Sequence, residues 1–134
     1  MKLLLDTHIF LWWAEEPEKL SRRAYALCQD PVSTLILSVA SIWEIQIKDQ
    51  LGRGGFNLRA PLDELIESQQ RQNDLVVLPV ELSHVLALRG LPVYAEHTDP
   101  FDRLLIAQAN AEDVTLLSAD RKIHKYSYPV RLAK

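Results

Sequence analysis

Leu3-Leu4-Leu5-Asp6 brings three consecutive leucines and an acid together near the start of the chain. A short continuous apolar run of this kind is typical of a strand that is buried on both faces of a parallel sheet. The next segment, His8 to Ala14, is apolar enough for a short helix, and Pro17 ends it. Open α/β sheets place their sites where strands end and helices begin, so Asp6 stands at a candidate site.

The same alternation of strand and helix continues along the chain. Helices are predicted from Ser21, over 39–51 before Gly52, from Pro61 as first helical residue to Asn73, over 81–89 before Gly90, and from Pro100. Further strands are predicted over 35–38, 75–78, 114–117 and 129–132. Strands separated by helices imply right-handed crossovers, which predicts the α/β class, as a three-layer α/β/α sandwich around a mostly parallel sheet.

Length and composition are those of an ordinary globular protein. The 134 residues suit one domain over 1–134, with 48% hydrophobic and 25% charged residues. Cys28 is the single cysteine, so no internal disulfide forms, and a reducing cytosol suits the chain. No apolar run approaches the ~18 residues that a membrane span requires. We therefore expect a cytoplasmic protein that does not bind membranes.

The net charge of −3 argues against tight, nonspecific binding of nucleic acid through bulk electrostatics. It leaves room for a local basic rim around an acidic centre. The candidates for such a rim are Lys48, Arg53, Arg59, Arg103, Arg121 and Lys122, although a solvated surface charge is the default for any one of them.

Four acids lie just after strand-like runs or in the opening turns of helices: Asp6, Glu44, Asp102 and Asp120. At one sheet edge their charges would repel, by about 1 kcal/mol per contact pair in water and by more when partly buried. A hard divalent cation such as Mg²⁺ relieves this repulsion, and it takes oxygen ligands. The pattern predicts a metal site for which the four acids suffice and no His or Cys ligand is needed.

Each acid also has a purely structural interpretation. Asp6 can cap the helix that follows it, Glu44 can pair with Lys48 on a helix surface, and Asp120 can serve as a turn residue. Asp99 is suited to be the N-cap of the helix that begins at Pro100, which leaves Asp102 in its first turn.

Four segments, in order over nearly the whole chain, resemble the PIN-domain ribonucleases, and most of all the VapC-type toxins of bacterial toxin–antitoxin pairs. The third segment is long enough to be specific. The segments are Leu4-Leu5-Asp6-Thr7-His8, Ser41-Ile42-Trp43-Glu44-Ile45-Gln46-Ile47-Lys48, His97-Thr98-Asp99-Pro100-Phe101-Asp102-Arg103-Leu104-Leu105-Ile106-Ala107-Gln108-Ala109 and Leu117-Ser118-Ala119-Asp120.

The resemblance implies a Mg²⁺- or Mn²⁺-dependent endoribonuclease that acts on RNA. It makes Asp6, Glu44, Asp102 and Asp120 the catalytic and metal-binding acids, and it places at Ser118 a hydroxyl that can hold a metal-bound water. Asp99 stays open as an alternative third acid. The resemblance also implies a homodimer and a cognate antitoxin whose tail enters the active-site groove.

The chemistry of the acids agrees with this interpretation. Hydrolysis of a phosphodiester needs an activated water, stabilised charge on the phosphate oxygens and help for the leaving oxygen, all of which a bound metal supplies. Because a metal-activated water need not use the 2′-hydroxyl, a structure-specific DNA nuclease stays an alternative. A non-catalytic module that binds RNA or protein is a further alternative.

A phosphoacceptor receiver domain also gathers acids at the carboxyl ends of a parallel sheet. It requires an acidic pair after the first strand, where this chain has Asp6-Thr7, and an acceptor acid after the central strand, where it has Pro79-Val80. The sequence therefore disfavours that class.

Two further groups of residues have open roles. His97 precedes the third motif and can orient a phosphate, orient an acid, or make a hydrogen bond at the rim. Trp12, Trp13 and Trp43 suit core or interface anchors better than base-stacking platforms, and Trp12 or Trp13 would suit a dimer.

Overall fold

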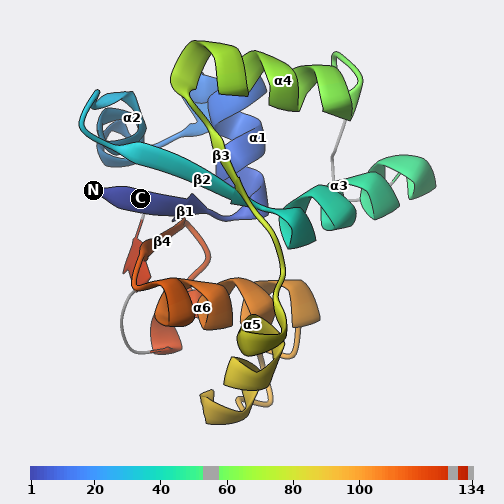
Figure 1. Ribbon diagram of the computed structural model, residues 1–134, viewed down its shortest axis with the longest axis vertical. Coiled ribbons are helices and arrows are strands. Elements are labelled where there is room, and N and C mark those ends of the chain that lie inside the picture. The colour runs from blue at the N-terminus through green and yellow to red at the C-terminus, as the bar shows by residue number, and fades with distance from the viewer. Residues whose placement is uncertain (53–57, 127–129, 133–134) are drawn as a thin grey trace.

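A five-stranded sheet forms the centre of the computed structural model, which describes residues 1–52, 58–126 and 130–132 (Figure 1). The strands lie in the order β3-β2-β1-β4-β5, and every pairing between them is parallel. Their bounds are β1 Lys2–Leu5, β2 Thr34–Ser38, β3 Val76–Leu78, β4 Thr115–Ser118 and β5 Val130–Leu132. The predicted α/β class with a mostly parallel sheet is confirmed.

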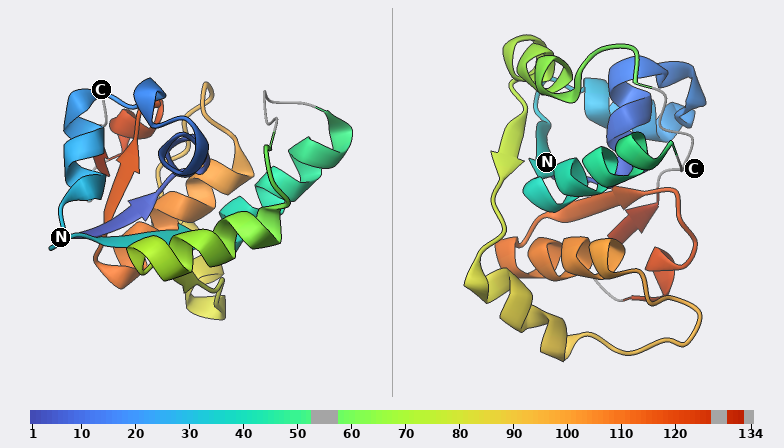
Figure 2. Two further views of the ribbon diagram at one scale, coloured as in Figure 1. Left: turned by 90° about the horizontal axis from the view of Figure 1, so that it is seen from above. Right: turned by 90° about the vertical axis from the view of Figure 1, so that its right-hand side faces the viewer.

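Helices cover both faces of the sheet, as the predicted three-layer sandwich requires. α1, α2 and α4 lie on one face and α5 and α6 on the other, while α3 extends beyond the edge where β2 ends (Figures 1 and 2). The bounds are α1 Thr7–Glu15, α2 Arg22–Gln29, α3 Val39–Leu51, α4 Leu62–Asn73, α5 Leu82–Ala87 and α6 Pro100–Glu112, with 3₁₀ turns at Pro17–Lys19, Leu88–Gly90 and Ile123–Lys125.

The leucine run of β1 is buried on both sides. Leu3 and Leu5 pack into the core beneath α1, together with Phe10, whereas Leu4 packs into the core beneath α6, together with Leu116. All five side chains are fully buried. Because successive side chains of a strand point to opposite faces, a strand between two helical layers must be apolar at every position.

Two predicted boundaries change in detail, and a third is confirmed. Pro61 is the N-cap of α4 and not its first helical residue, because its ψ of 143° is extended. The helix expected over 81–89 is α-helical only to Ala87 and tightens into a 3₁₀ turn that ends at Gly90. Gly52 ends α3 as predicted, in the left-handed conformation with φ of 65°.

The apolar stripe of α3 faces outward to a large extent. Val39, Trp43 and Leu51 are 42%, 61% and 59% exposed, although they follow the 3.6-residue repeat. The buried residues of this helix are Ala40, Ser41, Glu44 and Ile45. The buried face of α3 thus carries an acid, while Trp43 packs edge-on against Phe101 of α6 at 5.3 Å between ring centroids.

Within the described ranges, every helix is too short or too polar to cross a membrane. Cys28 is a buried residue of the core beneath α1, and burial raises the pKa of its thiol to about 12. It behaves as the small buried hydrophobe that its isolation in the sequence predicts.

Candidate active site

The site lies where the order of the strands reverses. The chain passes from β1 outward through β2 to β3 and then returns to the other side of β1 with β4. In open parallel sheets, ligands bind outside the carboxyl ends of the strands at such a switch point. Leu5 of β1 is paired with Leu117 of β4, so the residues that follow them, Asp6 and Ser118, are neighbours at that edge.

A pocket of about 420 Å³ opens at this edge, and the predicted acids surround it. Its acidic lining residues are Asp6, Glu44, Asp99, Asp102 and Asp120, and the others are Thr7, His8, Trp12, Lys48 and Ala119. The structure therefore brings together four acids that stand up to 114 positions apart in the sequence. Ser118 lies buried beside the pocket and does not line it.

Asp6 has a structural role and a place in the pocket at once. Its Oδ1 accepts a hydrogen bond of 2.8 Å from the backbone N of Ile9, which caps α1. Burial raises the pKa of Asp6 to about 6, against hydrogen bonds from Ser118 and Ile9 that lower it, and the charges of Asp120 and Glu44 raise it further. The N-cap interpretation is thus correct, and it does not remove Asp6 from the pocket.

Glu44 is buried, with 4% exposure, and is held from two sides. The Thr7 hydroxyl donates to its Oε1, and the Lys48 Nζ donates to its Oε2 at 2.8 Å. The predicted pair with Lys48 exists, but the interpretation as a surface ion pair is wrong because the carboxylate lies inside the pocket. Thr7 was not a predicted site residue, and only its position next to Asp6 could have pointed to it.

Asp99 and Asp102 make different contacts at the start of α6. Asp99 Oδ1 accepts from the backbone N of Phe101 at 2.9 Å and of Asp102 at 3.1 Å, which makes it the predicted N-cap of α6. Asp102 Oδ2 lies 3.1 Å from Nε2 of His97, so His97 contacts an acid of the pocket. Burial raises the pKa of Asp102 to about 6, against the hydrogen bond from His97 that lowers it, and the charges of Asp99, Asp6 and Glu44 raise it further.

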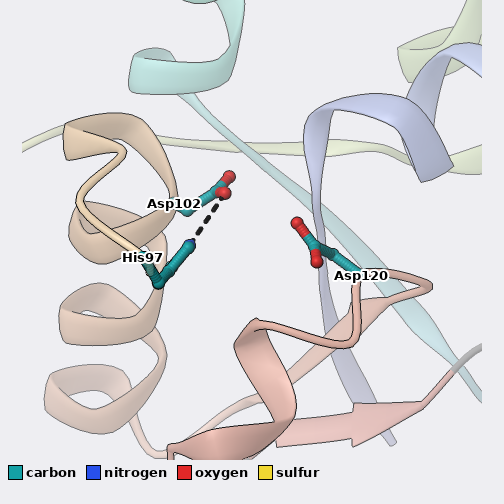
Figure 3. Close-up of side chains that lie close together, drawn as sticks. All are labelled: His97, Asp102 and Asp120. Atoms are coloured by element: carbon teal, nitrogen blue, oxygen red, sulfur yellow. Dashed lines mark hydrogen bonds and ion pairs between the residues drawn. The ribbon is translucent and has the colours of Figure 1, made fainter. Parts of the chain in front are cut away.

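The turn after β4 presents Asp120 opposite Asp102. The carboxylates of these two residues point into the same space, one from the start of α6 and one from the turn (Figure 3). Ser118 Oγ accepts from the backbone N of Asp120 at 3.0 Å, and Asp120 Oδ1 accepts from the backbone N of Lys122 at 2.9 Å. Asp120 is therefore a turn residue as well, and Ser118 ties it to Asp6.

The predicted basic rim is represented at the pocket by Lys48. Among the described residues, it is the only lysine or arginine that lines the pocket. Arg103 Nη1 instead donates to the carbonyl oxygen of Pro92 and to the hydroxyl of Tyr126. Arg121 lines a neighbouring hollow beside Trp12, and Arg53 lies outside the described residues.

The side chains present fit a hard divalent cation. Ligand atoms of His97, Asp102 and Asp120 lie within 4.8 Å of one another, and Asp6 and Glu44 face the same pocket. Carboxylate oxygens are the donors that Mg²⁺ and Mn²⁺ favour, and a bound cation would offset the burial and the repulsion that together raise the pKa values of Asp6 and Asp102.

A parallel sheet whose switch point carries clustered carboxylates defines an α/β protein with an acidic site. The PIN domain family model matches residues 3–127, and the chain belongs to this family. Ribonuclease VapC22 of Mycobacterium tuberculosis is 26% identical over 128 residues, which cover 95% of this chain and 93% of that protein.

Solved structures share the fold. VapBC2 from Rickettsia felis, bound to a DNA fragment from its promoter, aligns with a TM-score of 0.70 and 14% identity over 100% of both chains. VapBC-5 from Mycobacterium tuberculosis, a toxin–antitoxin system, aligns with a TM-score of 0.64 and 18% identity over 99% of this chain and 98% of that chain.

Proposed function

We propose that this protein is a Mg²⁺- or Mn²⁺-dependent endoribonuclease and the toxin of a toxin–antitoxin pair. The observation that carries the proposal is the convergence of Asp6, Glu44, Asp102 and Asp120 on one pocket at the switch point of the sheet. Membership of the PIN domain family and similarity to a protein named as a ribonuclease support it.

In this proposal the same four carboxylates hold the metal, with Asp99 as the cap of α6. When bound, the cation activates a water and neutralises charge on the phosphate. Thr7 and Lys48 fix the carboxylate of Glu44, and Ser118 ties the turn that carries Asp120 to Asp6. These contacts position the ligands before substrate arrives, which lowers the reorganisation that the reaction requires.

Lys48 has a second role in this account. Its ammonium is partly exposed and lines the pocket beside Glu44. A lysine in that position acts as a point charge toward a phosphate of the incoming strand. Because the pocket acids and the whole chain are negatively charged, a bound cation would supply the rest of the positive charge that an anionic substrate requires.

The partners follow from the same proposal. RNA is the substrate, and a cognate antitoxin protein binds the chain, since structures with this fold include toxin–antitoxin complexes. A homodimer is supported by the exposed apolar side chains of α3, Val39 and Trp43. Trp12 and Trp13, which the sequence also suggested as dimer anchors, are half-buried and pack against the core beneath α1.

Two alternatives concern the substrate and the activity. A DNA nuclease would use the same carboxylates, and a non-catalytic binding module would keep the pocket without cleavage. Single-stranded RNA and DNA of one sequence, each incubated with Mg²⁺ or Mn²⁺, distinguish the three. We expect cleavage of RNA only, loss of cleavage in Glu44→Gln, and full activity in Glu67→Gln, an exposed control on α4. Cleavage of DNA alone, or of neither strand, would contradict the proposal.

A further inference from the structure

His97 uses both of its ring nitrogens inside the protein. Nε2 lies 3.1 Å from Oδ2 of Asp102 (Figure 3), and Nδ1 lies 2.9 Å from the hydroxyl oxygen of Tyr126. His97 and Tyr126 are only 3% and 4% exposed. The imidazole therefore bridges a pocket acid to a buried tyrosine, and bulk water does not compete for the inner contact.

Arg103 leaves the proton of the Tyr126 hydroxyl available to His97. Its Nη1 donates to the Tyr126 hydroxyl at 3.0 Å and to the carbonyl oxygen of Pro92 at 2.8 Å. A guanidinium can only donate, so the phenol oxygen accepts from Arg103. The proton of the phenol is then free to be donated to Nδ1 of His97.

The opposite end of the bridge selects the same arrangement. An ionised carboxylate only accepts hydrogen bonds, so Asp102 requires a proton on Nε2 of His97. A neutral imidazole carries one proton, so its Nδ1 must accept, and Tyr126 supplies the matching donor. Arg103, Tyr126, His97 and Asp102 thus form one directed chain of hydrogen bonds.

We propose that His97 is a positioning residue that holds the carboxylate of Asp102 through its Nε2 proton, with Tyr126 and Arg103 fixing its tautomer, and that it is not a metal ligand. The ligand atoms of His97, Asp102 and Asp120 lie close enough to suggest a histidine ligand. A ring nitrogen that carries a proton has no lone pair for a metal, and carboxylate oxygens are the donors that a hard cation favours, so we assign the ligand role to the acids and the positioning role to His97. The inference rests on the proposed function only in treating Asp102 as a ligand.

The first test removes one hydroxyl at a time. Tyr126→Phe deletes the donor to His97 and keeps the ring, and Tyr94→Phe is the matched control. Tyr94 packs edge-on against Tyr126 at 5.1 Å between centroids, and its hydroxyl donates to the carbonyl oxygen of Lys125, outside the chain of hydrogen bonds. We expect calorimetry without RNA to show Mn²⁺ affinity about 10-fold weaker in Tyr126→Phe, the lower end for residues that orient a metal ligand. Tyr94→Phe should bind like the wild type.

The second test reads the tautomer directly in the wild-type protein. Nitrogen-15 NMR should find the proton of His97 on Nε2 in the metal-free protein and should find it there still after Mg²⁺ is added. Loss of that proton on adding Mg²⁺, or a proton on Nδ1, would overturn the inference even if Tyr126→Phe did not fold.

The two proposals fail in different ways. If the wild-type protein binds neither Mn²⁺ nor Mg²⁺, the proposed function fails and Asp102 is not a ligand for His97 to position. If the wild-type protein binds Mn²⁺ and Tyr126→Phe binds it equally well, only the role of His97 is overturned.

Discussion

The carboxylates of the pocket show that a structural and a chemical interpretation of one residue can both be correct. Asp6 caps α1 and Asp120 shapes the turn after β4, yet both line the pocket. Asp caps are common, so their sequence positions could not separate the two roles. The shared pocket shows both roles, because a cap needs only its own helix, whereas these acids converge from four separate segments.

Asp99 and Asp102 are predicted to respond differently to substitution. Asn caps a helix about as well as Asp, whereas Ala forfeits about 1 kcal/mol. Asp99→Asn should therefore keep stability and much of the activity, Asp99→Ala should lose stability first, and Asp102→Asn should stay folded but not cleave RNA. Thermal unfolding and RNA cleavage, measured on all three variants, check this. An inactive Asp99→Asn beside an active Asp102→Asn would make Asp99 the third ligand.

The raised pKa of Asp6 predicts a pH-dependent stability in chelator. Its pKa is about 6 in the folded protein against 3.8 as the ordinary value, so between these values only the folded state takes up the proton. Protonation thus stabilises the fold at low pH, and this contribution is lost as pH rises through 6. Asp6→Asn keeps the cap and cannot ionise, so its melting temperature should exceed that of the wild type increasingly from about pH 4 to pH 6.5, and the difference should level off above that.

The control for this pH series is Glu67→Gln, which alters an exposed carboxylate. Its difference from the wild type should stay constant across the same range. A difference between Asp6→Asn and the wild type that did not grow with pH would show that Asp6 ionises normally, and that burial in the pocket does not disfavour its charge.

At the scale of single elements, α3 departs furthest from what its sequence pattern suggests. A 3.6-residue apolar repeat normally marks a buried face, yet Glu44 lies on the buried face and Trp43 on the exposed one. The repeat locates the helix and its end at Gly52 correctly. It cannot tell which face meets the sheet, because that depends on where α3 leaves β2 and on the polar partners Thr7 and Lys48 that stabilise a buried acid.

Gly52 ends the helix that carries Glu44, and a matched pair of glycines tests this element. Gly52 has φ of 65°, and an added Cβ would meet nothing within 4 Å, so Gly52→Ala is penalised by conformation alone. We expect it to lose about 1 kcal/mol of unfolding free energy. Gly90 is equally open but outside the left-handed region, so Gly90→Ala should be neutral or slightly stabilising.

Urea unfolding of both glycine variants provides the measurement. Equal stability of the two would show that the left-handed end of α3 does not constrain the helix. A loss confined to Gly52→Ala, with Mn²⁺ affinity also reduced, would show that the end of α3 contributes to placing Glu44.

At the scale of the whole molecule, the alternation of strands and helices was enough to predict the sheet and its layers. The order of the strands could not be predicted from the sequence pattern. Leu35 to Leu37 and Leu116 to Leu117 are equally apolar, so either run could lie on either side of β1. The contact between His97 and Tyr126 could not be predicted either, because 29 positions separate the two residues and no motif links them.

Metal-dependent cleavage tests the central claim, that the acids around the pocket form a cation site for RNA hydrolysis. RNA cleavage by the wild-type protein should stop in chelator and return when Mg²⁺ or Mn²⁺ is added in excess. Asp120→Asn should stay inactive throughout this series although it folds, and Glu67→Gln should follow the wild type. Cleavage that persists in chelator, or that survives in Asp120→Asn with unchanged metal dependence, would contradict the account.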